Sequence, residues 1–368
     1  MALHRSSAVP LAWLYTGLIV YASLYPFTGW RPPGHSPFAY LLQGWWPWWT
    51  WFDLVSNLIG YFPFGLLVCG ALVRSGWRSS RAAATASLAG IALSFSMETL
   101  QNWLPTRVSS NVDLVLNSLG AVMGAGIAAL VHRHGGVERW ELAREQWFIR
   151  RSAGGLALLL LWPVGLLFPT SVPFGLGQVL GRVRDRLALL LEGTAGEAWT
   201  ALWTTGGPPS PLQPSGELAL VVMGLLAPCL LALSIAAPGW RRVVLVLGAV
   251  GIGCVTMTLS TALNFGPDHA AAWVTPQAVE AVLVSTAAAV LLTLVPRRVA
   301  AGLGLMALTA LAMLVARAPA DPYYAQSLQG WEQGRFIRFH GAAQWVGWAW
   351  PYAAIAYLLA RIAARDPA

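Results

Sequence analysis

Residues 218–237 read LALVVMGLLAPCLLALSIAA, and no charged side chain interrupts them. A helix rises about 1.5 Å per residue, so about 20 apolar residues cross the roughly 30 Å hydrocarbon core of a bilayer. Comparable uncharged stretches recur along all 368 residues of the chain. The stretch therefore predicts a membrane-spanning helix, and its recurrence predicts a protein that crosses the membrane many times.

The composition supports the same conclusion. Apolar and aromatic residues make up 57% of the chain and charged residues only 10%, whereas a soluble domain has about 45–50% apolar and about 25% charged residues. All 23 basic residues are arginine, and the formal net charge is +8. Because loop arginines orient membrane proteins, this charge favours membrane lipids and not nucleic acid as partners. The three cysteines lie inside apolar stretches, where we interpret them as packing residues.

The apolar windows predict an all-α polytopic transmembrane helix bundle of about ten spans. Arginines and Pro/Gly/Trp clusters mark the ends of these spans. The expected spans are 8–26, 52–73, 82–103, 112–132, 152–169, 217–237, 243–263, 278–296, 299–316 and 345–360. The expected domains are a four-helix membrane domain (1–132), a cytoplasmic linker (133–151) and a six-helix membrane domain (152–368) with long extracytoplasmic loops at 170–216 and 317–344.

The arginines also predict an orientation. When loops are assigned alternately to the two sides, eight arginines fall on one side, and the remaining 15 of the 23 fall on the other. The eight are Arg31, Arg107, Arg182, Arg184, Arg186, Arg317, Arg335 and Arg338. Since the cytoplasmic side of a membrane protein carries the excess of positive charge, both termini are predicted to be cytoplasmic, in a bacterial inner membrane.

A few polar residues in the first four spans are not explained by orientation. A charged side chain costs at least about 2.5–3.5 kcal/mol at the centre of a membrane helix, so such residues are candidates for a functional site. With the predicted orientation, all of them lie toward the extracytoplasmic side. They are Asp53, Asn57, Glu98, Gln101, Arg107, Asp113 and Asn117.

Two of these segments repeat each other. Residues 53–60 read DLVSNLIG and residues 113–120 read DLVLNSLG, with Asp, Leu, Val, Asn and Gly in the same register. The match predicts a duplicated helical hairpin in the first four spans, related by an axis near the membrane normal. Gly120 and Gly124 form a G-x-x-x-G pattern, which is typical of closely packed membrane helices.

The order of the motifs resembles the VanZ-like family of bacterial membrane proteins. SLYPF at 23–27 is followed by Asp53 and Asn57, then by PFG at 63–65. The later motifs are Glu98-x2-Gln101, LPTR at 104–107 and Asp113-x3-Asn117-x2-Gly120. The resemblance covers about residues 10–130 and implies a cell-envelope role, because the name-giving member is associated with lowered susceptibility to the glycopeptide antibiotic teicoplanin. It leaves open whether the protein is an enzyme, and it says little about spans five to ten.

Three roles remain open for the cluster. It can clamp the duplicated hairpins together, or bind a lipid phosphate or glycolipid headgroup through the fork of Arg107, with Asn57, Gln101 and Asn117 as further ligand contacts. As a third role, Glu98, Asp113 and Asp53 can act as catalytic acids or bases. The oxygen-rich set is also compatible with a divalent cation such as Mg²⁺ or Ca²⁺.

We predict recognition, extending to modification, of an envelope lipid or lipid-linked glycan headgroup at the outer leaflet. The alternatives are a transporter or flippase for such a lipid or glycan precursor, and a non-catalytic scaffold of an envelope complex.

The second half offers weaker candidates. Thr256, Ser260 and Asn264 form a polar stripe that leads to Asp268 and to His269 in the following loop; it indicates either interhelical hydrogen bonding or a further wall of an outer cavity. The other secondary candidates are Glu280, Arg335, Arg338 and His340. Two isolated histidines do not indicate a zinc site. Residues 178–191 have the spacing of a helix that lies in the outer membrane interface.

Overall fold

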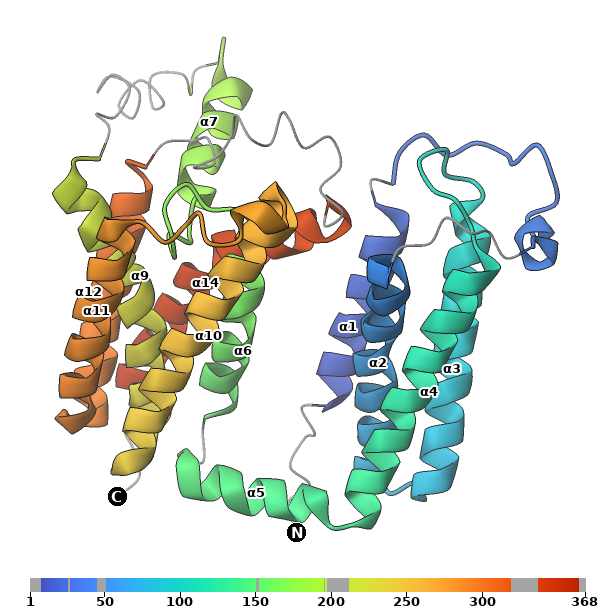
Figure 1. The fold of residues 1–368 in the computed structure, drawn as a ribbon, viewed down its shortest axis with the longest axis horizontal. Coiled ribbons are helices and arrows are strands. Elements are labelled where there is room, and N and C mark those ends of the chain that lie inside the picture. Colours follow the sequence, from blue (N-terminus) through green and yellow to red (C-terminus); the bar gives the residue numbers. More distant parts are fainter. Residues whose placement is uncertain are drawn as a thin grey trace. The chain divides into compact units, whose positions relative to one another are not determined.

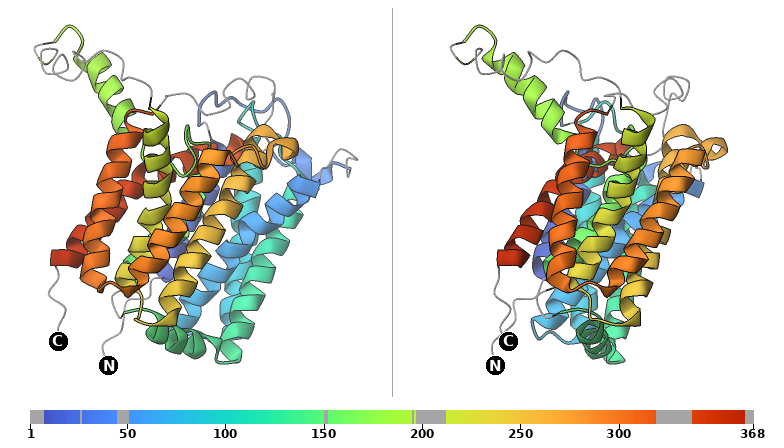
Figure 2. Two further views of the ribbon diagram at one scale, coloured as in Figure 1. Left: turned by 60° about the vertical axis from the view of Figure 1, so that its left-hand side comes forward. Right: turned by 90° about the vertical axis from the view of Figure 1, so that its left-hand side faces the viewer.

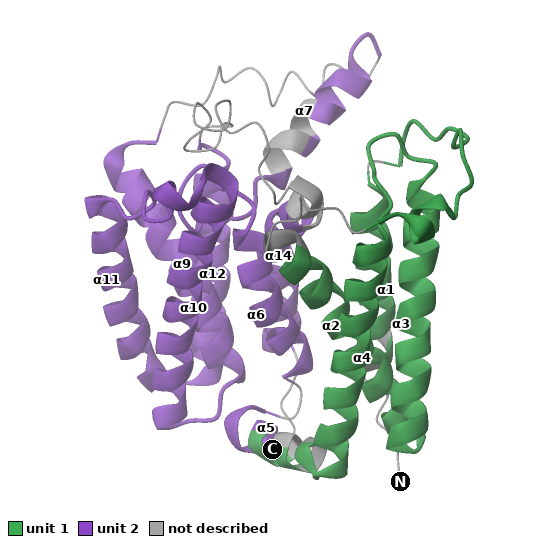
Figure 3. Ribbon diagram, turned by 45° about the vertical axis from the view of Figure 1, so that its right-hand side comes forward, with its two compact units in different colours: residues 1–143 green, residues 144–368 purple. Residues whose placement is uncertain are grey.

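The computed structural model describes residues 8–25, 27–44, 51–149, 152–194, 196, 212–318 and 337–363, although some helical side chains within these ranges lie outside the description. The chain divides into two compact units, unit 1 (Met1–Ala143) and unit 2 (Arg144–Ala368), which Figure 3 colours separately. Each of the ten expected spans contains a helix, and the part of the chain that the structure describes contains no β-strand. The prediction of an all-α helix bundle is therefore confirmed.

Seven helices are long and apolar enough to cross a membrane. They are α2 (Trp51–Arg74), α3 (Ser79–Gln101), α4 (Asn111–Arg133), α9 (Pro214–Ile235), α10 (Trp240–Phe265), α11 (Pro276–Leu291, counted to Leu294) and α12 (Arg297–Val315). Two further apolar helices are shorter, α1 (Ala8–Leu24) and α6 (Ala153–Leu166). The protein is thus a multi-pass membrane protein by the length and composition of its helices.

Unit 1 is built around the contact between α2 and α4, the most extensive between any two of its helices, with α3 against both and α1 against α2 and α3 (Figure 1). Glycines allow this approach. A Cβ added at Gly120 would lie 2.1 Å from the carbonyl oxygen of Leu58, and one added at Gly124 would lie 2.0 Å from that of Phe62. The G-x-x-x-G prediction of close helix packing is confirmed. Helix α5 (Gly136–Trp147) follows α4, inside the expected linker.

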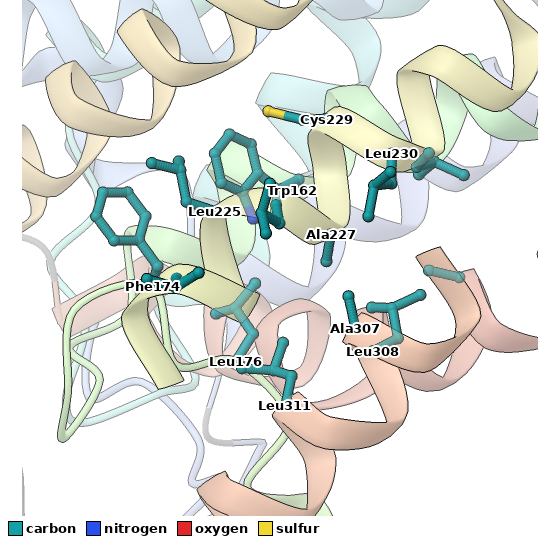
Figure 4. Packing of buried hydrophobic residues seen from close by; sticks show 14 of the residues in the cluster. Trp162, Phe174, Leu176, Leu225, Ala227, Cys229, Leu230, Ala307, Leu308 and Leu311 are labelled. Carbon is teal, nitrogen blue, oxygen red and sulfur yellow. The ribbon is translucent and has the colours of Figure 1, made fainter. Parts of the chain in front are cut away.

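Unit 2 surrounds α9, the helix that contains the stretch 218–237. Almost every side chain of α9 from Leu220 onward is buried, and the helix contacts α6, α10, α11 and α12. Figure 4 shows this core, where Leu225, Cys229 and Leu230 of α9 face residues of neighbouring helices. The last long helix is α14 (Ile337–Ala363), and α7 (Val179–Leu191) projects beyond the ends of its neighbours in unit 2 (Figure 2).

Residues 167–178 differ from the expectation of a surface connection. Phe174 and Leu176, near the start of the expected loop 170–216, are fully buried. The Phe174 ring stacks on Trp162 at 6.4 Å between ring centroids and meets Trp273 edge-on at 5.8 Å. Irregular backbone is tolerated inside a membrane protein where protein covers it, and this segment enters the core of unit 2 after α6 ends.

Candidate functional site

The predicted polar residues gather at one end of unit 1, where α1 and α3 end and α2 and α4 begin; we call this the site end. The side chain of Asp53 lies outside the described residues, although its backbone belongs to the first turn of α2. The other six make hydrogen bonds that connect the helices to one another or to the α3–α4 loop.

Arg107 and Gln101 bind the C-terminal end of α1. One Nη2 atom of Arg107 donates to the carbonyl oxygens of Ala22 (2.9 Å) and Tyr25 (2.7 Å), and Nε2 of Gln101 donates to that of Ser23 (3.1 Å). The last carbonyls of a helix have no partner within it, and a cation is favourable beside them because of the helix dipole. The guanidinium of Arg107 therefore donates at least two hydrogen bonds to the protein itself.

Glu98 joins the end of α3 to the start of α4. Its side chain is only 3% exposed, and its Oε2 atom accepts a hydrogen bond from the backbone N–H of Ser110 at 2.9 Å. Ser110 is the N-cap of α4, and its hydroxyl accepts from the N–H groups of Val112 and Asp113. Ser109 donates to the Glu98 carbonyl at 2.6 Å. The carboxylate is thus held where the two helices meet.

Asn57 and Asp113 connect α2 to α4. Nδ2 of Asn57 donates to Oδ1 of Asp113 at 2.6 Å, and both side chains are half-buried. Asn117, one turn further along α4, is buried and donates to the hydroxyl of Ser94 on α3 at 3.1 Å. The two equivalent asparagines of the sequence repeat therefore contact different helices.

Several site residues were missed by the sequence argument because they bind a loop. The segment 36–43 lies against the site end: Nδ2 of Asn102 donates to the carbonyl of Pro37 (3.0 Å) and Nδ2 of Asn111 to that of Gln43 (2.6 Å). The fully buried Tyr40 places its hydroxyl 3.3 Å from Oγ1 of Thr99. The sequence does contain a signal for Asn102: it follows Glu98 by one helical turn, so it was a candidate for the same face of α3.

The electrostatics around Tyr40 favour its neutral form. Burial raises the pKa of the Tyr40 hydroxyl above its usual value, and the negative charge of Glu98 adds to this rise, against the opposing effect of the hydrogen bond to Thr99. Tyr40 therefore remains a phenol at neutral pH and holds the loop by a neutral contact.

The described side chains give limited support for a metal ion. Among them, no group of three or more His, Cys, Asp and Glu residues has a metal-binding arrangement. Glu98 and Asp113 are the described carboxylates that could contribute oxygen ligands, and Asp53 lies outside that search. A divalent cation at this site stays a prediction.

The secondary candidates lie in unit 2. Asp268 and Glu280 are exposed. Arg335 lies outside the described residues, as do the side chains of Arg338 and His340 at the start of α14.

The polar stripe of α10 has a structural role. Ser260 and Asn264 donate to the carbonyl oxygen of Leu167 at 3.1 and 2.9 Å. Leu167 is the C-cap of α6, so Ser260 and Asn264 make the interhelical hydrogen bonds that were one of the two interpretations of the stripe. Thr256 donates to the carbonyl of Ile252 in its own helix at 2.7 Å.

Comparison with known proteins agrees with the motifs of the first unit. Residues 10–132 match the family model described as VanZ/LLP1. No curated protein and no solved structure matches the chain.

Proposed function

Residues 10–132 are a VanZ-like region of a multi-pass membrane protein, and from this premise we propose that the site end recognises the headgroup of an envelope lipid or lipid-linked glycan. In this proposal the site end faces the outer leaflet of a bacterial inner membrane. The headgroup contacts the polar residues, and its hydrocarbon part remains in the bilayer.

The Asn57–Asp113 pair is the observation that carries the proposal. It places a carboxylate in the first turn of α4 and an amide in the second turn of α2, both half-buried, where two membrane-spanning helices meet. Polar groups at such a position are costly and commonly functional. Carboxylate and amide oxygens both accept hydrogen bonds. The pair therefore has the chemistry that suits a ligand with hydroxyl donors.

The chemistry of the site favours a hydroxyl-rich headgroup over a bare phosphate. Two hydrogen bonds of Arg107 go to the end of α1, which leaves less of its fork for an anion. Glu98 and Asp113 are acceptors of hydrogen bonds, and a glycan supplies hydroxyl donors. A sugar or glycerol headgroup thus matches the described side chains better than a phosphate does.

The test is the identity of the lipid that purifies with the full chain. Lipids bound to the wild-type protein in mild detergent would be identified by native mass spectrometry and extraction. We expect one hydroxyl-rich lipid class to be enriched, and Asp113→Asn to reduce that enrichment several-fold. The corresponding change from carboxylate to amide at the exposed Glu145, Glu145→Gln, is the matched control and should leave it unchanged.

The absence of any enriched lipid in the wild-type protein would contradict the proposal. The site end would then be a clamp between helices, within a scaffold.

A more specific version of the proposal is that the protein also modifies the bound headgroup. Glu98 supports it because a carboxyl group that is 3% exposed at the end of a membrane helix is in the surroundings where general acids and bases are found. With the co-purified lipid as substrate, Glu98→Gln should abolish turnover while lipid binding and the thermal unfolding midpoint stay near the wild-type values. Unchanged turnover would exclude Glu98 as the acid or base.

A further inference from the structure

An apolar groove runs along unit 1 between α3 and α4. Large side chains from both helices line it, among them Leu88, Ile91 and Phe95 of α3 and Val115, Leu119 and Val122 of α4. The one polar side chain in the lining, Ser118, donates its hydroxyl to the carbonyl of Leu114 at 2.6 Å. The groove therefore offers a ligand almost no hydrogen-bonding group.

The groove lies on two helices, α3 and α4, that are long and apolar enough to span a membrane. Four of its lining residues, Leu88, Ile91, Val115 and Leu119, are exposed on the surface of unit 1. A concave apolar surface in a bilayer gains many small dispersion contacts when a chain follows its shape. The occupant that fits both the chemistry and the surroundings is a lipid chain.

The groove leads to the site end. Ile91 and Phe95 precede Glu98 by seven and three residues, so the three side chains share one face of α3. The Glu98 carboxylate accepts from Ser110 at the start of α4, and so it lies where α3 and α4 are joined above the groove. Phe38 of the 36–43 segment stacks on Phe95 at 6.0 Å between ring centroids, at the same end.

We propose that the α3–α4 groove binds the hydrocarbon chain of the lipid whose headgroup is recognised at the site end. The inference deepens the proposed function and rests on it for the identity of the headgroup. From Leu88 to Phe95 the helix rises about 10 Å, so the groove holds the first part of a chain, nearest the headgroup, and the remainder extends along α3 and α4 into the bilayer.

The test uses the full chain in nanodiscs that contain phosphatidylglycerol with a photoreactive diazirine on one acyl chain. After irradiation, mass spectrometry maps the labelled residues. We expect labelling to concentrate on the groove and to fall several-fold in Ala92→Trp, since the indole would fill the groove from its α3 side. The matched control, Ile59→Trp, adds the same side chain at an exposed position of α2 and should leave groove labelling unchanged.

Even labelling of all exposed apolar residues of α2, α3 and α4 would overturn the inference, as would full groove labelling in a folded Ala92→Trp protein. If that variant fails to fold, Ser118→Leu occupies the groove from α4 and replaces it. Asp113→Asn separates the two proposals: it should change which lipid co-purifies, whereas groove labelling by the phosphatidylglycerol probe should persist. Groove labelling without any headgroup selectivity in the wild-type protein would therefore contradict the proposed function alone.

Discussion

Arg107 stabilises the end of α1 through two backbone carbonyl oxygens, those of Ala22 and Tyr25. A hydrogen bond to a charged group contributes about 1.5–3 kcal/mol, so Arg107→Ala should lower the thermal unfolding midpoint in detergent clearly. Arg107→Lys should recover part of the loss, because an ammonium group keeps the charge but not the planar fork. Arg31→Ala, at an exposed position of the same end, is the control. An unchanged midpoint for Arg107→Ala would exclude the clamp.

Two phenylalanines, Phe27 and Phe174, have the same left-handed backbone conformation but lie in different surroundings. Phe27 and Phe174 have φ values of 61° and 62°, in a region that costs a non-glycine residue about 1–2 kcal/mol. Phe27 is exposed and Phe174 is fully buried. Phe27→Gly should thus change stability by less than about 1 kcal/mol, since relief of strain offsets the added chain entropy. Phe174→Gly should destabilise by about 3–5 kcal/mol because it empties the core.

Chemical or thermal denaturation of both variants, each against the wild-type protein, measures the difference. Equal effects at the two positions would show that the residues 167–178 are not packed in the core of unit 2 as the structure has them.

The sequence predicted that the polar residues of unit 1 lie toward one end of its helices, but it did not predict their bonding partners. The costs of burying charge make residues such as Glu98 conspicuous in an apolar chain. Their partners here are largely backbone groups, for example the carbonyl of Ser23 and the N–H of Ser110. All residues have a backbone carbonyl and all except proline have a backbone N–H. The pattern of side chains therefore does not reveal such partners, and the loop contacts of Asn102 and Asn111 were missed for the same reason.

At the scale of elements, the repeated segments of α2 and α4 are alike in sequence but not in packing. Gly120 lies against the backbone of Leu58, whereas a Cβ at the equivalent Gly60 would meet nothing within 4 Å. Gly120→Ala should therefore destabilise by about 1–3 kcal/mol through overpacking. Gly60→Ala should be neutral or stabilising by up to about 1 kcal/mol, because alanine is the better helix former.

This pair tests the α2–α4 contact, since the substitution and the sequence context are nearly identical. The measurement is the unfolding midpoint of each variant in the same detergent. A Gly120→Ala protein as stable as Gly60→Ala would contradict backbone contact between the two helices.

Hydropathy predicted the helices well, but it did not predict which helix faces contact lipid and which contact other helices. The stretch 218–237 is uncharged in the way expected of a lipid-facing span, yet in unit 2 most of it is enclosed by other helices. By contrast, α2, α3 and α4 have most of their side chains partly or fully exposed. An apolar side chain is favourable in lipid and in protein alike, so composition does not separate the two surroundings.

At the scale of the whole molecule, the arginines that predict the orientation also hold helix ends together. The guanidinium of Arg242 is buried and donates to the carbonyls of Thr293 (2.9 Å) and Val295 (2.6 Å), while Arg297 donates to that of Ala236 (3.0 Å). These contacts give part of the positive charge in the short basic loops a structural role, so that charge is not explained by orientation alone. The exposed Arg78 and Arg81 beside the α2–α3 connection are therefore the stronger evidence for a cytoplasmic side.

Accessibility of single cysteines to a membrane-impermeant maleimide tests this orientation in intact bacterial cells and in opened ones. His35→Cys and Asp268→Cys, at exposed positions predicted to be extracytoplasmic, should react in intact cells. Ser80→Cys and Pro296→Cys, exposed beside the basic connections, should react only after the membrane is opened. Cys69 and Cys229 are buried and Cys254 is half-buried within an apolar helix, so they should give little background. If Ser80→Cys reacts in intact cells and His35→Cys is protected, the site end faces the cytoplasm. The ligand would then have to be sought among cytoplasmic lipids and precursors.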